Sequence, residues 1–282
     1  MAKSSVIEWT DATWNPWHGC IKVSPGCKHC YMYRDKLRFG QQPSLVVRSK
    51  TTFQDPLSWR APKLIFTCSW SDWFIETADE WREEAWDIVR MTPHHTYQIL
   101  TKRPERVLEH LPKDWYDGWP NVWIGVSIES QDYVSRKLLL EAVPASVRFI
   151  SAEPLLGPID IGPLNKIDWV ITGGESGPNA RPMDSDWALS IRDQCLDEGI
   201  PYFHKQNGGL KKRDGAWGGR ILAGRTWDEM PVPRQVHLAS QSLEQEPALI
   251  GWHAMLTDEL ELTRLQLQNL LGAIPGRSAR SR

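Results

Sequence analysis

Short, nearly all-apolar segments alternate along the chain with segments of helical periodicity, and this alternation limits the folds that the chain can form. The apolar segments begin about 20–35 residues apart and cover residues 64–68, 96–101, 122–128, 147–152, 169–173 and 201–205. Strands without alternating polar residues are buried on both faces, as in a parallel sheet covered by helices. Helix signals at Asp79, Pro104 and Asp186 fall between these segments.

With a further strand expected at residues 6–9, the chain contains about seven strand–helix units. The pattern predicts an α/β fold, a complete or partial βα (TIM-like) barrel. No G-x-G-x-x-G motif follows the first expected strand, which argues against a Rossmann sheet. We expect the barrel to cover residues 1–234. Residues 235–282 are expected to form an appended tail with a leucine-rich helix over 257–271.

Bulk composition indicates an ordinary globular protein. The 282 residues are 41% hydrophobic and carry a net charge of −2, which neither favours nor excludes a nucleic-acid partner. Apolar runs stay short of the roughly 18 residues needed for a membrane span, and no secretory leader is evident. We therefore expect a cytoplasmic protein with no membrane partner. The composition leaves the oligomeric state open.

Three of the five cysteines lie within eleven residues, at Cys20, Cys27 and Cys30, in a loop that we place at residues 14–31. Such clustering favours metal ligation over disulfides. Gly19, Pro25 and Gly26 are expected to supply the tight turns that bring the sulfurs together.

Two kinds of metal site fit three clustered cysteines. A [4Fe-4S] cluster bound by three cysteines keeps one iron open for a ligand. Alternatively, His18 or His29 could complete a closed Cys3His zinc site, which would indicate a zinc-binding nucleic-acid module without enzymatic activity.

The cysteine loop, followed by strand–helix units, resembles the radical S-adenosylmethionine (SAM) superfamily. It departs from the usual C-x3-C-x2-C pattern, because six residues (21–26) separate the first two cysteines and His29 precedes the last. The strings W-N-P-W-H-G-C, G-C-K-H-C-Y, I-S-A-E-P-L-L-G-P-I and I-T-G-G-E-S-G-P resemble a group of phage and bacterial proteins known only as a domain of unknown function. That resemblance covers roughly residues 1–230.

The resemblance implies a radical SAM isomerase with a [4Fe-4S] cluster, SAM and an external electron donor. In phage members of this group, 5-Nα-glycinylthymidine in viral DNA is converted to 5-Cα-glycinylthymidine. This thymidine hypermodification protects bacteriophage DNA from restriction, and the enzyme would act in the host cytoplasm. Its partner would be DNA or a modified nucleotide. A radical SAM enzyme that repairs DNA lesions, in the manner of a lyase, is the alternative within this superfamily.

Polar residues follow six of the expected strands, and in a βα barrel these positions meet at one edge. Ser69, Ser71 and Asp72 are expected to bind the SAM amino group, and Ser127 resembles hydroxyl residues that hold its ribose or carboxylate. Gly173-Gly174-Glu175 resembles the Gly-Gly-Glu that binds SAM, although it follows a later strand. We therefore expect the two glycines to permit close backbone approach beside the cofactor, and Glu175 to contact substrate or ribose.

Two further cysteines lie outside the loop. Cys68 ends an expected strand and is a candidate hydrogen-atom donor, whereas Cys195 is expected to pack in a helix. A positive rim suited to phosphates is expected from Lys102, Arg103, Arg181, Lys205, Lys211, Lys212 and Arg213.

Overall fold

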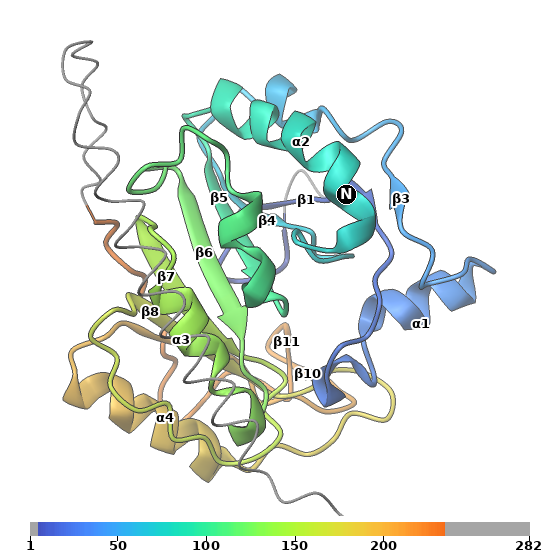
Figure 1. Ribbon diagram of the computed structural model, residues 1–282. Coiled ribbons are helices and arrows are strands. Elements are labelled where there is room, and N and C mark those ends of the chain that lie inside the picture. Colours follow the sequence, from blue (N-terminus) through green and yellow to red (C-terminus); the bar gives the residue numbers. More distant parts are fainter. Residues whose placement is uncertain (1–4, 235–282) are drawn as a thin grey trace, which may run out of the picture. The chain divides into compact units, whose positions relative to one another are not determined.

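A parallel sheet of seven strands, curled into a half-barrel, organises the chain (Figure 1). The computed structural model describes residues 5–234, and the expected tail and its helix lie outside the described residues. In spatial order the strands are β1 (Ala12–Trp14), β4 (Leu64–Thr67), β5 (Thr96–Thr101), β6 (Val122–Ser127), β7 (Val147–Ala152), β8 (Trp169–Gly173) and β9 (Tyr202–Gln206). Each strand pairs with the next along the chain, as in a βα barrel, while β1 and β9 form the edges of the sheet. The barrel is therefore partial.

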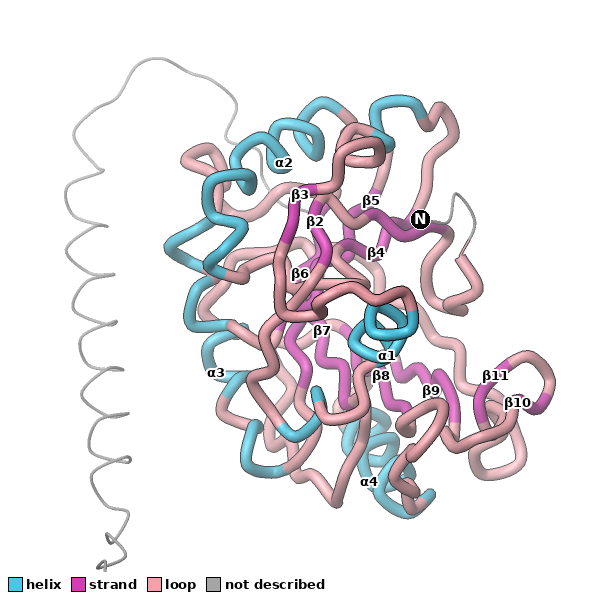
Figure 2. Tube along the Cα trace, turned by 90° about the vertical axis from the view of Figure 1, so that its right-hand side faces the viewer, coloured by secondary structure: helices cyan, strands magenta, loops and turns pink. Residues whose placement is uncertain are grey.

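Helices cover the outer side of this sheet. They are α2 (Asp79–Met91), α3 (Arg136–Glu141) and α4 (Ser185–Asp197). The helix α1 (Tyr31–Arg38) follows the cysteine loop and lies on the other side of the sheet from α3 and α4 (Figures 1 and 2). Two small antiparallel pairs complete the fold, β2 (Trp17–His18) with β3 (Val47–Arg48) and β10 (Lys212–Arg213) with β11 (Ala216–Trp217). Within residues 5–234, no helix has the length and apolarity needed to cross a membrane.

The six apolar segments are confirmed as strands, whereas the expected strand at residues 6–9 is wrong. Those residues form a turn in which Val6 is 88% exposed, and β1 begins three residues later at Ala12. Ala12 and Trp14 are fully buried and pair with β4. The first strand therefore forms in a segment that is shorter and less obviously apolar than residues 6–9, because that segment is the one buried in the sheet. The segment that begins at Pro104 forms two short 3-10 turns, Pro104–Arg106 and Leu108–His110, and not an α-helix.

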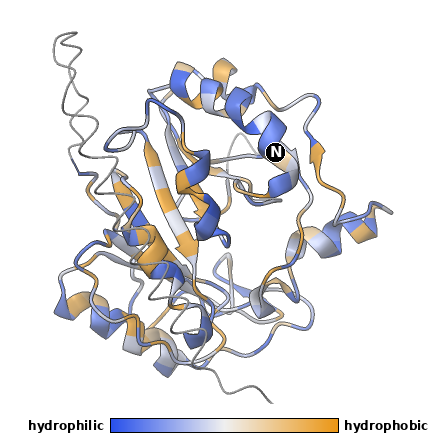
Figure 3. Cartoon of the chain, viewed as in Figure 1, coloured by the Kyte–Doolittle hydropathy of each residue, from blue (hydrophilic) through white to orange (hydrophobic). Residues whose placement is uncertain are grey.

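Apolar side chains fill both faces of the sheet, as the colouring of β6 illustrates (Figure 3). On the concave face, an aromatic cluster of Trp9, Trp123, Phe149, Trp169 and Phe203 fills one end of the half-barrel. Gly125 contributes no side chain there, because a Cβ atom would lie 2.5 Å from the Phe149 ring. Two residues further along β6 and β7, the same face carries serines. The carboxyl end of the half-barrel is therefore the polar end.

Candidate functional site

A cavity of about 530 Å³ opens at the carboxyl edge of the sheet. Its floor is apolar and includes Trp9, Phe66 and Leu100, while residues 5–9 and the β10–β11 hairpin contribute to its walls. Cys20, Cys27 and Cys30 all line this cavity. The fold therefore brings the three clustered cysteines to one space, and that space has the size of sites that enclose small molecules.

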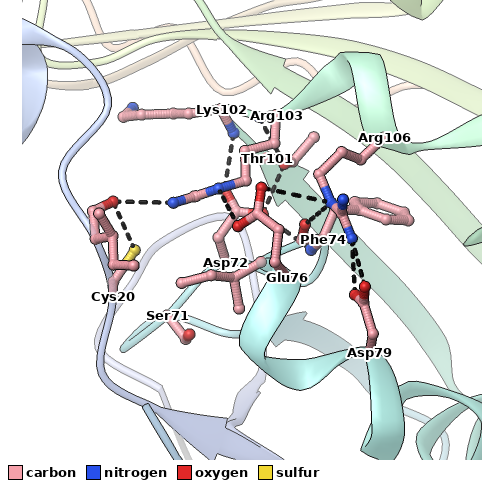
Figure 4. Close-up of polar contacts among 12 residues, drawn as sticks. Cys20, Ser71, Asp72, Phe74, Glu76, Asp79, Thr101, Lys102, Arg103 and Arg106 are labelled. Carbon is pink, nitrogen blue, oxygen red and sulfur yellow. Dashed lines mark hydrogen bonds and ion pairs between the residues drawn. The ribbon is translucent and has the colours of Figure 1, made fainter. Parts of the chain in front are cut away.

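Cys20 is held by backbone contacts on both sides. Gly19 before it has a φ of +101°, and a Cβ atom there would overlap the carbonyl of Leu45. The predicted need for glycine at this turn is therefore confirmed. The Cys20 amide donates to the Pro43 carbonyl at 3.0 Å. The Arg103 side chain, just after β5, donates to the carbonyl of Ile21 at 3.0 Å and so holds the loop directly after Cys20 (Figure 4).

Cys27 ends a 3-10 turn, Pro25–Cys27, whose packing explains Gly26. Pro25 and Gly26 form this tight turn, as expected, although Gly26 does not have a positive φ. Its hydrogen side chain leaves space for Glu129, whose Cγ would lie 2.5 Å from a Cβ atom at residue 26. Close approach, and not backbone freedom, requires glycine here.

Cys30 directly precedes α1, so the helix sets its position. The hydroxyl of Tyr31, the first residue of α1, donates to the Ser69 carbonyl beyond β4. This contact fixes the start of the helix to the edge of the sheet. Each of the three cysteines thus has a different attachment to the strand ends.

The thiols of Cys20 and Cys30 lie in a low-dielectric environment that favours their neutral form. Burial raises the pKa of Cys20 to about 12, with Asp72 adding to the shift and Arg103 opposing it. Burial also raises the pKa of Cys30, against which Lys102 acts weakly. Bound metal deprotonates such thiols, because the metal charge replaces the proton.

The residues of this cavity do not surround a single ion. Within the described part of the chain, no group of three or more His, Cys, Asp and Glu side chains is arranged to hold one metal ion. His29 lines the cavity together with the cysteines, whereas His18 lies on β2 with its Nδ1 atom buried and without a hydrogen-bond partner.

Ion pairs join the strand ends around the cavity. The pairs are Asp72–Arg103 at 3.2 Å, Lys102–Glu129 at 2.9 Å, Glu153–Lys205 at 2.6 Å and Glu175–Arg181 at 2.5 Å. Three of them link side chains from different strand ends. The polar residues that follow the strands therefore meet as predicted, but they largely neutralise one another.

The three residues expected to bind the SAM amino group contact protein atoms. Asp72 is 5% exposed, accepts three hydrogen bonds, from the Phe74 and Lys102 amides and the Thr101 hydroxyl, and forms an ion pair with Arg103. Ser71 donates to the Gly19 carbonyl at 2.6 Å, and the Ser69 hydroxyl bonds to the side chain of Asn15. These residues line the cavity and at the same time hold the cysteine loop. Their role toward SAM remains a prediction.

Some of the other predicted site residues line the cavity, and some support the chain segments around it. Ser127 and Glu175 line the cavity, and Arg181 occupies both carboxylate oxygens of Glu175. Burial by itself raises the pKa of Glu175, but Arg181 outweighs it and holds the pKa below its usual value.

Both glycines of the Gly-Gly-Glu string are packed against other chain segments. A Cβ atom at Gly174 would overlap the Asn207 carbonyl, so this glycine permits contact between two backbone segments. A Cβ atom at Gly173 would lie 3.3 Å from Glu153. Of the two, Gly174 lines the cavity.

The two remaining cysteines differ in their surroundings. Cys68 lines the cavity at 3% exposure, with a φ of +52°, and burial raises the pKa of its thiol well above the usual value. Cys195 is fully buried in α4, which confirms its predicted packing role.

The expected positive rim is only partly free. Lys102, Arg103, Arg181 and Lys205 are engaged in the ion pairs described above. Lys211, Lys212 and Arg213 are exposed on and beside the β10–β11 hairpin, where Lys212 also contributes to the cavity wall. The hairpin is therefore the part of the rim that presents unshielded positive charge.

Glu129 is the main residue of this site to which the sequence assigned no role. It follows β6, is fully buried, and contacts Lys102, Arg136 and the Ser24 hydroxyl. Burial alone raises its pKa, but Lys102, Ser24 and Arg136 together hold the pKa below its usual value. The signal in the sequence that could have identified Glu129 was its position just after a buried strand.

Comparison with known proteins gives one family assignment. Searches of curated proteins and of solved structures found no match. The model of the DUF5131 family, described as a protein of unknown function, matches residues 4–231. This range includes the cysteine loop and every strand of the half-barrel. The chain therefore belongs to the DUF5131 family.

Proposed function

We propose that the chain is a radical SAM enzyme in which Cys20, Cys27 and Cys30 bind a [4Fe-4S] cluster and SAM binds beside it. The observation that carries this proposal is that all three cysteines line one cavity at the carboxyl edge of a partial βα barrel. In such folds, this edge is where ligands and catalytic groups gather.

The donor set suits a cluster. Thiolates are the usual ligands of iron–sulfur clusters, and each binds a different iron, so their sulfurs need not converge on one point as they do in a zinc site. Arg103 beside Cys20 and Lys102 near Cys30 would partly offset the negative charge of the thiolates. The cavity beside the cysteines leaves room for a ligand at the open iron. When bound, the cluster supplies the electron that cleaves SAM to a hydrogen-abstracting radical.

The protein's part is to orient ligands and exclude water. The aromatic floor excludes solvent from the inner end of the cavity, and Ser127 and Ser151 place hydroxyl groups above it. Cys68 would donate a hydrogen atom from its buried thiol to a substrate radical, and an external reductant would restore the thiol. Glu175, fixed by Arg181, would accept hydrogen bonds from substrate or ribose.

The proposed substrate is 5-Nα-glycinylthymidine in phage DNA, which would be isomerised to 5-Cα-glycinylthymidine. Support comes from the resemblance over roughly residues 1–230 and from the chemistry, because moving a bond to an unactivated glycyl carbon suits a radical. The exposed Lys211, Lys212 and Arg213 beside the cavity would attract phosphates.

Anaerobic reconstitution with iron and sulfide tests the cofactor. We expect a brown protein that forms 5′-deoxyadenosine from SAM when dithionite is added. Cys20→Ala should lose both properties, while Cys195→Ala, which removes a buried thiol that does not line the cavity, should keep them. A colourless, zinc-containing protein would favour the zinc-binding module instead.

Nucleoside mass spectrometry tests the substrate. Expression with the genes that form the glycinyl adduct should convert the nitrogen-linked nucleoside to its carbon-linked isomer. Removal of a lesion without such an isomer would instead identify a DNA repair enzyme.

A further inference from the structure

Glu129 occupies an unusual position for a buried carboxylate, because it contacts the cysteine loop and not only its own neighbours. It lies beyond the end of β6 at 0% exposure, yet Ser24, 105 positions earlier in the chain, donates to its Oε1 atom at 2.6 Å. The same oxygen accepts from Lys102 at 2.9 Å, and Oε2 accepts from Arg136 at 2.9 Å. The two cations hold the carboxylate in place beneath the loop.

The loop is shaped to receive this carboxylate. Ser24 precedes the Pro25–Cys27 turn, but its side chain does not cap that turn and bonds to Glu129 instead. Its hydroxyl also lies 3.8 Å from the Cys27 sulfur. At Gly26 any side chain would meet the carboxylate, so the residues on both sides of Pro25 contact Glu129.

The other two cysteines are attached elsewhere. Arg103 bonds to the loop after Cys20, and Tyr31, which follows Cys30, bonds to the Ser69 carbonyl. Among the hydrogen bonds described above, those of Glu129 are the ones that hold the middle of the loop to the sheet. We propose that Glu129 is a positioning residue that sets the place of Cys27 relative to Cys20 and Cys30, through its contacts with Ser24 and Gly26.

The contacts of Glu129 with Ser24 and Gly26, called the anchor below, do not depend on what the cysteines bind. They can therefore be tested on protein without metal. The measurement is the rate at which each cysteine reacts with iodoacetamide under native, anaerobic conditions, resolved by peptide mass spectrometry. Ser24→Ala removes one hydrogen bond to a charged group. Loss of such a bond raises the equilibrium constant for local opening of the loop by about tenfold or more. We therefore expect Cys27 to react about tenfold faster, while Cys68 and Cys195 keep their rates.

Substitution at Glu129 tests the other partner of the contact. In Glu129→Gln, the charge that holds Lys102 and Arg136 is lost while the size of the side chain is kept, and we expect the same increase for Cys27. Glu141→Gln is the matched control, because it removes a glutamate paired with Lys137 on α3, away from the cavity lining. It should leave all cysteine rates unchanged.

A double substitution separates positioning from general stability. Gly26→Ala and Glu129→Ala disrupt the same contact, so the pair should raise the Cys27 rate no further than Glu129→Ala alone. In reconstituted protein, iron bound per chain should fall in Ser24→Ala and Gly26→Ala but not in Glu141→Gln.

Two results would overturn the anchor: an unchanged Cys27 rate in both Ser24→Ala and Glu129→Gln, or an equal rise at all five cysteines, which would indicate global unfolding. Failure of the wild-type protein to bind iron, together with a selective rise at Cys27, would reject the proposed function and leave the anchor in place.

Discussion

Removal of the Asp72 carboxylate tests whether this residue maintains the site or binds the ligand. In the structure both of its oxygens are occupied, by two backbone amides, by Thr101 at 2.7 Å and by Arg103 at 3.2 Å. The side chains of Asp72 and Arg103 are only 6% and 4% exposed. Glu76, the other carboxylate near Arg103, is 3.8 Å away and 58% exposed, so it is a weak substitute.

Asp72→Ala therefore leaves a buried guanidinium without its main partner. Breaking a buried ion pair in this way costs about 3–5 kcal/mol. For a folded region of this size, each kcal/mol lowers the melting temperature by about 2–4 °C, so we expect a loss of about 6–20 °C. Ser71→Ala is the control at the same strand end, since it removes one neutral hydrogen bond worth about 1 kcal/mol.

Urea unfolding followed by tryptophan fluorescence measures the free energy of unfolding, and equilibrium dialysis of the reconstituted protein measures SAM binding. The structural reasoning is wrong if Asp72→Ala unfolds within about 1 kcal/mol of the wild-type protein. If that variant also loses SAM affinity, Asp72 binds the amino group as the sequence predicted. A large loss of stability would instead assign Asp72 to the support of Arg103 and the cysteine loop.

Three further predictions concern other parts of the site. Burial lowers the pKa of His204 to about 4 from 6.5. As the pH falls, the unfolded chain therefore binds the proton first, so the contribution of His204 to the free energy of unfolding is complete above pH 6.5 and falls toward pH 4. At pH 5 the loss in the free energy of unfolding is about 2 kcal/mol. His204→Gln should lack this part of the pH dependence in urea unfolding at pH 7 and pH 5, and an identical pH dependence in the two proteins would refute it. Gly174→Ala forces a methyl group against the Asn207 carbonyl and should cost about 1–3 kcal/mol in the same assay, whereas Gly157→Ala, with open space around it, should be nearly neutral. Cys68→Ala should still form 5′-deoxyadenosine but lose the isomerised nucleoside; an unchanged rate of product formation would remove Cys68 from the mechanism.

Much of the fold was predictable because buried parallel strands leave a simple sequence signal. Strands β4 to β9 come from short segments rich in apolar residues, and their spacing matches strand–helix units. The first strand was missed because β1 has only three residues, and its burial comes from packing against the rest of the sheet. Residues 6–9 have a strand-like composition, yet only Trp9 among them is buried.

The site was predictable as a set of positions but not as a set of partners. The carboxyl ends of the strands were expected to meet, and they do. Which charge faces which could not be read from the chain, so Asp72 and Glu175 were treated as free to bind ligands. In the folded protein Arg103 and Arg181 occupy them. Gly26 was correctly expected in a turn, but its close contact with Glu129 was not predicted, because nothing near it in sequence indicates Glu129.

By itself, the sequence determined the strand–helix alternation, the grouping of three cysteines in one loop and the polar character of the strand ends, since each of these depends on neighbours in the chain. Only the tertiary structure decided how the loop is attached. The decisive contacts join Ser24 to Glu129 across 105 positions and Arg103 to Ile21 across 82. Such contacts leave no periodic pattern, because they depend on which strand ends become adjacent when the sheet curls.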